Sequence, residues 1–311
     1  MMLPGSGLIS SLAAGALRVW LIVGILLRVT RLRDGWDWLA LVYYSTPWPA
    51  IAVGFVVLAL HARRKAKGHA FRRYVLLTGA ALFTWIATSW YGGDAPPPGT
   101  AKLRVVLWNV AHPESRLARQ AAWLKAQDAD IIALAEADPD DRSNLLEWSR
   151  SFPDHAIVQS RGNMLCIIRG EVLAKGSGEL ASGSQFGRIR ARVRGRELTI
   201  LQADIYARPR VSRRAPFARL HGLVEAEKGP LILLGDFNTP RESALFDPIR
   251  KRLTQSFEAA GHGLAETWPS FAPALSIDQI WTSAPLRPLH CEHGWTTRSD
   301  HRPVTVDLAW D

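Results

Sequence analysis

The sequence predicts an α+β fold with two packed sheets and outer helices, preceded by about three transmembrane helices. Long apolar runs concentrate before residue 92, and a Gly/Pro segment follows them. From residue 102 onward, short β-branched apolar runs alternate with segments of helical spacing. We therefore expect a membrane anchor at residues 1–92, a linker at 93–101 and a folded domain at 102–311.

The membrane anchor is predicted from three apolar runs, at residues 8–27, 38–60 and 74–90. Each approaches the roughly 20 residues that cross a hydrocarbon core. The first run contains Arg18, which costs about 2.5–3.5 kcal/mol at a helix centre and makes this run the weakest span. The second contains Pro47 and Pro49, which predict a kink. The alternative, a buried helical core, is disfavoured because basic loops separate the runs.

Loop charges predict an orientation. The loop at residues 61–73 carries Arg63, Arg64, Lys65, Lys67, Arg72 and Arg73. The positive-inside rule places such a loop in the cytoplasm. Because one more apolar run follows it, we expect a multi-pass protein of the cell (inner) membrane whose C-terminal domain is extracytoplasmic. The short linker would hold that domain at the membrane bilayer.

The overall charge and the cysteine content indicate which partners and metal sites the chain can have. The net charge of +10 and the pI of about 10.1 favour anionic partners, either nucleic acid or a phospholipid surface. Cys166 and Cys291 have no His or Cys nearby at zinc-ligand spacing, so a structural zinc site is not expected. A disulfide between them and two half-buried thiols are both open.

The C-terminal domain is predicted to hold many strands and a few helices. Apolar, β-branched runs predict strands at residues 103–110, 130–136, 155–160, 164–169, 188–193, 197–204, 231–236, 276–281 and 303–308. Helical spacing predicts helices at residues 114–127 and 212–228. This alternation is typical of sheets covered by helices.

Polar side chains fall at the ends of these predicted strands. The positions are Asn109, Glu136, Asp204 and Asp236, with Asp278 inside a strand and Asp300 and His301 opening the last one. Taken singly, each has a structural explanation such as an ion pair, an Asx turn or a cap. Buried carboxylates that converge need a compensating cation, and hard divalent cations prefer oxygen ligands. Together these residues favour a metal-assisted phosphoester site.

Five motifs carry a family resemblance. They are LWNV (107–110), DIIALAEA (130–137), LLGDFNTP (233–240), SIDQIW (276–281) and RSDHRPV (298–304). In this order they resemble the endonuclease/exonuclease/phosphatase family of deoxyribonuclease-like enzymes, and the apolar leader resembles its membrane-anchored members. The resemblance implies a four-layer α/β/β/α sandwich over 102–311 and hydrolysis of phosphoesters.

The resemblance also implies roles for single residues. Glu136 would bind Mg²⁺, or Mn²⁺ in its place, with Asn109 and Asp300 close by; Asn109 is also a candidate substrate contact. Asp236 would orient or deprotonate the attacking water, and Asn238 would hydrogen-bond the phosphoryl oxygens. His301 would be a second acid/base group, held by Asp278, because a carboxylate partner fixes the ring and raises its pKa.

Two positions depart from the family pattern. Ala111 stands where an Asp or Asn is common, and Asp204 stands at the usual position of a His, with Tyr206 two residues on. Asp204 and Tyr206 therefore remain catalytic candidates whose chemistry differs from that of an imidazole. Arg208 and Arg210 are candidate substrate-binding residues for a phosphate, with a solvated basic face as the alternative.

Three functions follow from these patterns. The favoured one is an extracytoplasmic phosphatase or phosphodiesterase that acts on a phosphorylated substrate, such as a lipid phosphate or pyrophosphate. The second is a membrane-tethered nuclease that acts on DNA or RNA. The third is an inactive domain that binds a phosphate ligand, which Ala111 and Asp204 motivate. No protein partner is predicted.

Overall fold

The computed structural model describes residues 6–30, 32–93, 103–113 and 116–311. Two compact units divide the chain, Met1–Trp90 and Tyr91–Asp311. Apart from Gly93, the predicted linker at 93–101 lies outside the described residues. The two units are described separately below.

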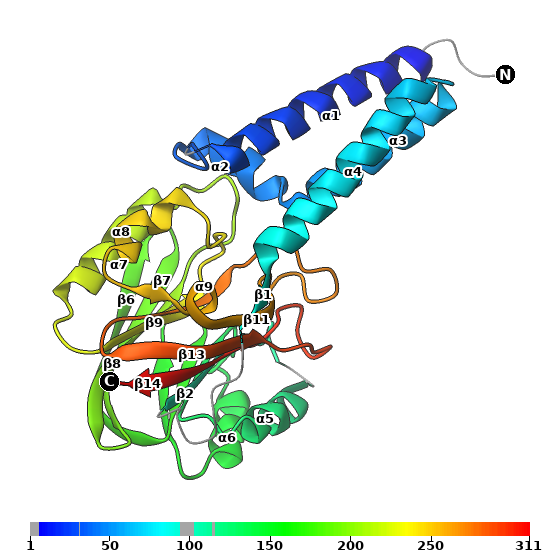
Figure 1. Cartoon of the computed structure of the whole chain (residues 1–311). Helices are drawn as coiled ribbons and strands as arrows, with labels where there is room; N and C mark the ends of the chain where they lie inside the picture. Colours follow the sequence, from blue (N-terminus) through cyan, green and yellow to red (C-terminus); the bar gives the residue numbers. More distant parts are fainter. Residues whose placement is uncertain (1–5, 31, 94–102, 114–115) are drawn as a thin grey trace. The chain divides into compact units, whose positions relative to one another are not determined.

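The N-terminal unit is helical (Figure 1). Its helices are α1 (Ser6–Val29), α2 (Asp37–Ser45), α3 (Trp48–Arg64) and α4 (Gly68–Ser89). The chain bends by 68° between α2 and α3. Pro47 is the N-cap of α3 and Pro49 lies in its first turn, so the predicted kink occurs where proline removes backbone donors.

The expectation of about three transmembrane helices is wrong for the described residues. There, α1 alone is long and apolar enough to cross a membrane, over Ser10–Val29, and the bent pair α2–α3 adds one more if it counts as a single span. Arg18, which made the first run look weakest, donates from Nε to the Tyr74 hydroxyl at 2.8 Å. Helix α4 is not a candidate span, because Arg72 and Arg73 lie near its start and shorten its apolar stretch.

The predicted orientation of the C-terminal domain depended on α4 as a membrane span. An extracytoplasmic C-terminal domain required the run at 74–90 to cross the bilayer after the basic loop. Since α4 is long enough for a span with its 22 residues but not apolar enough, the multi-pass and extracytoplasmic expectations are not supported.

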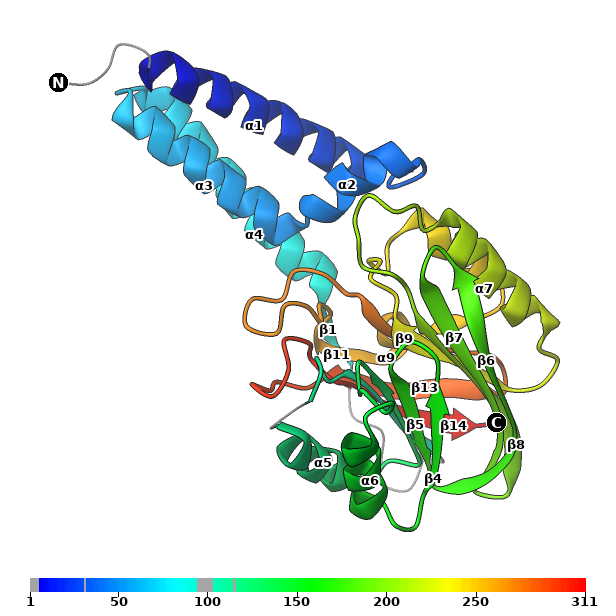
Figure 2. The same ribbon diagram turned by 180° about the vertical axis from the view of Figure 1, so that it is seen from behind.

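Two mixed sheets form the C-terminal unit (Figures 1 and 2). The eight-stranded sheet has the order β1 (Trp90–Gly92), β11 (Gly261–Leu264), β13 (Leu286–His293), β14 (Val304–Trp310), β2 (Leu103–Asn109), β3 (Ile131–Ala135), β5 (Met164–Ile168), β4 (Ala156–Ser160). The six-stranded sheet has the order β10 (Thr254–Gln255), β12 (Asp278–Thr282), β9 (Leu231–Asp236), β8 (Arg196–Asp204), β7 (Ser184–Val193), β6 (Gly170–Ala181).

Helices cover the outer face of each sheet. Helices α5 (Leu117–Ala126) and α6 (Arg142–Ser151) pack through Leu124 and Trp148 on the eight-stranded sheet. Helix α7 (Arg214–Ala226) packs through Leu220 on the six-stranded sheet, beside the short helices η2 (Ala244–Phe246) and α8 (Asp247–Arg250). Helix α9 (Ser256–Ala260) follows β10. The unit is therefore an α+β sandwich with two packed sheets, as the sequence predicted.

The core between the sheets explains why the predicted strands are so apolar. Val105 and Ile131 of one sheet meet Ile200 and Ile232 of the other, and all four are fully buried. Strands buried on both faces read as continuous apolar runs. Cys166 and Cys291 lie in this same core as free, fully buried thiols, so no disulfide joins them.

Candidate active site

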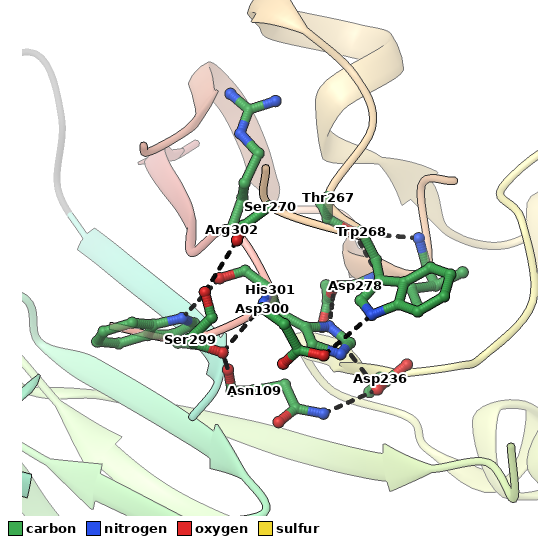
Figure 3. Close-up of polar contacts among 12 residues, drawn as sticks. Asn109, Asp236, Thr267, Trp268, Ser270, Asp278, Ser299, Asp300, His301 and Arg302 are labelled. Carbon is green, nitrogen blue, oxygen red and sulfur yellow. Dashed lines mark hydrogen bonds and ion pairs between the residues drawn. The ribbon is translucent and has the colours of Figure 1, made fainter. Parts of the chain in front are cut away.

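The first part of the site lies where β2 and β3 end. These strands are parallel, with Asn109 in register with Ala135, so Asn109 and Glu136 leave the sheet at the same edge. The Asn109 side-chain amide donates to Glu136 Oε1 at 3.0 Å and to Asp236 Oδ2 at 3.0 Å. Because Asp236 belongs to the other sheet, Asn109 bridges the two sheets at this edge (Figure 3).

The second part is a row of carboxylates on the six-stranded sheet. Asp236 is in register with Asp204 on parallel β8 and with Asp278 on antiparallel β12. Asp236 and Asp278 are buried, with 2% and 1% of their surfaces exposed. Asp278 begins β12, whereas the sequence placed it inside a strand. Three acidic side chains therefore occupy neighbouring strands at one end of the sheet.

His301 joins this row from the loop before β14. Its Nδ1 lies 2.9 Å from Asp278 Oδ2 and 4.0 Å from Asp236 Oδ2. Burial lowers the pKa of His301, but the charge and hydrogen bond of Asp278 outweigh it, and the pKa is raised above its usual value. The ring is thereby held as a cation next to two carboxylates.

The loop that carries His301 is fastened to the end of β2 (Figure 3). Ser299 Oγ donates to the Asn109 carbonyl at 2.7 Å and accepts the His301 backbone N–H at 3.0 Å. Trp108 Nε1 donates to the His301 carbonyl at 3.1 Å. Both sheets thus fix the imidazole, one through Asp278 and the other through this loop.

The charges at the site fit a divalent cation. Burial, then repulsion from Asp278, raises the pKa of Asp236 above its usual range, although His301 opposes this rise. Burial and the charge of Glu136 raise the pKa of Asp204 to about 7. Asp278 Oδ1 is buried without a hydrogen bond among the described residues. In the absence of a metal ion the His301 proton offsets the two carboxylates, and the atoms of Asp236, Asp278 and His301 that could ligate a cation lie within 4.8 Å of one another. Such crowded oxygens are the donors that hard cations prefer.

Other predicted site residues are engaged differently. Asn238 donates its backbone N–H to Asp236 Oδ1 at 2.9 Å and its side-chain amide to the Ile205 carbonyl at 2.8 Å. Asp300 is exposed and accepts from Trp268 Nε1 at 3.2 Å. Ala111 donates its backbone N–H to Asn109 Oδ1 at 2.9 Å. The metal-binding roles of Asn109 and Asp300 remain predictions.

The predicted basic contacts lie on an exposed segment after β8. Arg208 packs over the Tyr206 ring, with its guanidinium carbon 5.5 Å from the ring centre. Arg208 and Arg210 are both exposed. No described contact brings these arginines to Asp236 or His301, so their substrate-binding role stays a prediction.

Sequence reasoning missed a second histidine, His112. Its Nδ1 lies 2.8 Å from Asp138, and its Nε2 lies 3.4 Å from Glu136 Oε2. The sequence alone carries no signal for this pair, because their meeting depends on the strand register, in which Asn109 is paired with Ala135 and His112 and Asp138 each follow three residues later. Two parallel strands in register deliver equally spaced residues to the same place.

Left-handed backbone conformations occur at this edge. Ala111, His112, Glu136, Asp138 and Asn238 have positive φ angles between 46° and 51°. Non-glycine residues rarely adopt this conformation, and such residues cluster at functional sites. The strain therefore supports the assignment of this edge as the active site.

A comparison with protein-family models decides the family. The model of the endonuclease/exonuclease/phosphatase family matches residues 106–301, most of the C-terminal unit. The chain belongs to the endonuclease/exonuclease/phosphatase family. Membership makes it a phosphoester hydrolase, and enzymes of this family use divalent metal ions.

Solved structures share the fold of this family member at low sequence identity. An endonuclease/exonuclease/phosphatase family protein from Bacteroides thetaiotaomicron is 17% identical, with a TM-score of 0.57 over 67% of this chain and 95% of that one. The mannosyl-6-phosphatase of the same organism is 17% identical, with a TM-score of 0.56 over 67% and 100%. D. rerio TDP2 in complex with a single-strand DNA product is 14% identical, with a TM-score of 0.59 over 66% and 98%. No curated protein sequence matches the chain.

Proposed function

We propose that this chain is a membrane-anchored phosphatase or phosphodiesterase that uses Mg²⁺, or Mn²⁺ in its place, and acts on phosphorylated substrates at a bilayer surface. The observation that carries the chemistry is the cluster of Asp236, Asp278 and His301, with Asn109 and Glu136 bonded to it. Lipid phosphates and pyrophosphates are the substrates that a membrane anchor favours.

The residues divide the chemistry between them. Glu136, with Asn109 and Asp300, would hold the cation, which lowers the cost of the charge that develops on the phosphoryl oxygens. Asp236 would accept the proton of the attacking water, and its raised pKa improves it as a base. His301 would donate its proton to the leaving oxygen, and Asn238 would contact the phosphoryl group. Asp204 and Tyr206 remain catalytic candidates.

Exposed apolar side chains support the membrane anchor. On α1, Leu12, Val19 and Val29 expose 66%, 63% and 64% of their surfaces. Only 22% of the spanning window of α1 is buried, whereas the core helix of a soluble protein would be mostly buried. A continuous exposed apolar surface of this kind is typical of contact with lipid.

Phosphate release tests the catalytic proposal. Full-length protein in detergent would be assayed with and without Mg²⁺ on lipid phosphates and pyrophosphates, beside Glu136→Ala and Asp236→Ala. We expect both variants to lose most of the activity. Unchanged turnover in both would contradict the assignment of the site. Membrane fractionation of the full chain, beside a chain that lacks residues 1–30, tests the anchor.

A nuclease is the second candidate. The net charge of +10 favours nucleic acid as well as anionic lipid, and the solved TDP2 structure of the same fold holds a single-strand DNA product. Nicking of a supercoiled plasmid by the wild type, absent in Asp236→Ala, would favour this function over lipid hydrolysis.

A further inference from the structure

A groove of about 770 Å³ opens beside the catalytic loop. Two segments form its walls, Ser270–Phe271 and Trp295–Asp300, and Arg116 closes one side. This volume is in the range that holds a small-molecule ligand. None of these residues belongs to the Asp236–Asp278–His301 cluster, so the groove is a neighbouring space.

Hydrogen bonds join the two segments that line the groove, and one of these segments leads directly to His301 (Figure 3). Ser270 donates its backbone N–H to the Asp300 carbonyl at 2.6 Å and its hydroxyl to the Ser299 carbonyl at 2.9 Å. Asp300 lines the groove and directly precedes His301. The groove therefore lies beside the loop that carries His301, and the part of a substrate beyond its reacting phosphate has space there.

Arg298 brings an unused positive charge to the groove. Its Nε is buried without a hydrogen-bond partner among the described residues, and no described carboxylate pairs with its guanidinium. Arg116, the other arginine, already donates to the Ala111 carbonyl at 2.6 Å. A guanidinium that lines a groove without a carboxylate partner is suited to bind a phosphate or a carboxylate.

Two exposed aromatic side chains line the same groove. Phe271 exposes 84% of its surface and Trp295 exposes 64%. The Arg302 guanidinium packs on the Trp295 ring, 4.1 Å from its centre, and so fixes one face of that ring. Aromatic side chains left this exposed beside a catalytic loop are suited to cover an apolar group.

We propose that this groove is the leaving-group subsite, and that Arg298 binds a second phosphate while Phe271 and Trp295 cover the apolar or aromatic group attached to it. The proposal rests on the proposed hydrolase function and deepens it to diphosphate esters. Water would attack the terminal phosphorus, the bond from that phosphorus to the bridging oxygen would break, and the products would be inorganic phosphate and the monophosphate ester. The bridging oxygen would take its proton from His301, and Asp236 would take one from the water.

Paired substrates test this subsite on full-length protein in detergent. Phosphate release would be measured from geranyl diphosphate and geranyl monophosphate, and from ADP and AMP, with Mg²⁺. We expect the wild type to prefer each diphosphate over its monophosphate by at least about tenfold in kcat/KM. Arg298→Gln should erase most of that preference. Phe271→Ala and Trp295→Ala should lower kcat/KM for the preferred diphosphate by about threefold to tenfold.

The controls separate this inference from the proposed function. Arg219→Gln, which removes an exposed charge on α7, should leave every value unchanged. A preference for geranyl diphosphate over ADP identifies a lipid-like chain as the occupant, and the reverse identifies an aromatic base. If the wild type hydrolyses these substrates and Arg298→Gln keeps the diphosphate preference, the proposed subsite is contradicted, but the proposed hydrolase function is not. If none of the four substrates is hydrolysed, the subsite proposal fails, and the phosphate-release and plasmid-nicking assays described above decide the proposed function separately.

Discussion

Asp236 and Asp278 are direct register partners on antiparallel strands β9 and β12, and one imidazole contacts both. His301 Nδ1 is bonded to Asp278 at 2.9 Å and lies 4.0 Å from Asp236. The two carboxylates therefore differ in environment: Asp278 is bonded to the charged His301 ring, whereas Asp236 accepts hydrogen bonds from Asn238 and Asn109. A single sheet register thus gives two chemically equal side chains different proposed roles: Asp278 holds the proposed acid, His301, and Asp236 is the proposed base.

Asp278→Asn should lower kcat by roughly 10²- to 10⁴-fold, which is the usual contribution of a positioned acid/base group to the rate. The carboxylate raises the pKa of His301, so its loss lowers that pKa. The alkaline limb of the pH profile of kcat should then move to lower pH, because the ring loses its proton earlier. Asp154→Asn, in an exposed turn, should change neither quantity. An unmoved alkaline limb would count against the role of His301 as an acid.

Asp236→Asn should abolish activity and stabilise the metal-free protein. Burial and Asp278 raise the folded pKa of Asp236, so its ionisation destabilises the fold as pH rises above the unfolded value. Removing that charge should add about 1 kcal/mol at pH 7, or roughly 2–4 °C in Tm, and little at pH 4. Thermal unfolding in EDTA at both pH values measures this. A Tm of Asp236→Asn below that of the wild type at pH 7 would show that the buried carboxylate does not destabilise the folded protein.

The sequence could predict this much of the site because buried strands end abruptly on polar residues. The apolar runs that end at Asn109, Asp204 and Asp236 became β2, β8 and β9 with those residues at their ends. The glycine-rich β6 and the proline-containing β13 were not predicted, since neither has a continuous apolar run. The strand order, which sets Asp236 beside Asp278, depends on long-range pairing that no local pattern contains.

The wrong membrane span and the missed histidine also have local causes. The apolar length of 74–90 suggested a span, but the helix that forms there begins at Gly68 and includes Arg72 and Arg73. The pair of His112 and Asp138 was missed because their contact requires positive φ angles at both residues. Backbone conformations of this kind are imposed by the surrounding fold and have no composition signal outside glycine.

Glu136→Gln should remove the stabilisation that a divalent ion gives. If Glu136 holds the ion, Mg²⁺ at about 100 times its dissociation constant adds about 2.7 kcal/mol to the wild type. The neutral amide keeps the shape but loses the charge, so its Tm should rise far less with Mg²⁺ or Mn²⁺. Glu179→Gln, remote in sequence from every proposed ligand, serves as the control. Equal Tm shifts in wild type and Glu136→Gln would place the ion elsewhere.

Gly235→Ala should disrupt the pairing that carries Asp204 and Asp236. Gly235 has φ +151°, and a Cβ there would lie 1.8 Å from the Ala203 carbonyl oxygen on β8. Backbone on both strands would have to move, so we expect a loss of at least about 3 kcal/mol. Chemical unfolding followed by tryptophan fluorescence measures it. Gly229→Ala, where a Cβ meets nothing within 4 Å, should be nearly neutral; equal effects would contradict the clash.

His293 should make the fold sensitive to acid. Burial lowers its pKa well below the usual value, and Arg302 and Arg241 lower it further. Above about pH 6.5 the ring is neutral in the folded and unfolded states, so it adds no pH dependence. Below that value only the unfolded state takes the proton, and the free energy of unfolding falls by up to about 1.4 kcal/mol per pH unit.

A neutral substitute isolates this contribution of His293. His293→Gln loses the ring stack on Phe257, whose centre lies 4.3 Å away, so it should be less stable than the wild type at pH 7. Its stability should nevertheless fall less steeply between pH 6.5 and 4.5, and the gap between the two proteins should narrow as the pH drops. His221→Gln on the exposed face of α7 should keep the wild-type slope. A gap that stays constant with pH would show that His293 takes up its proton in the folded protein as readily as in the unfolded chain.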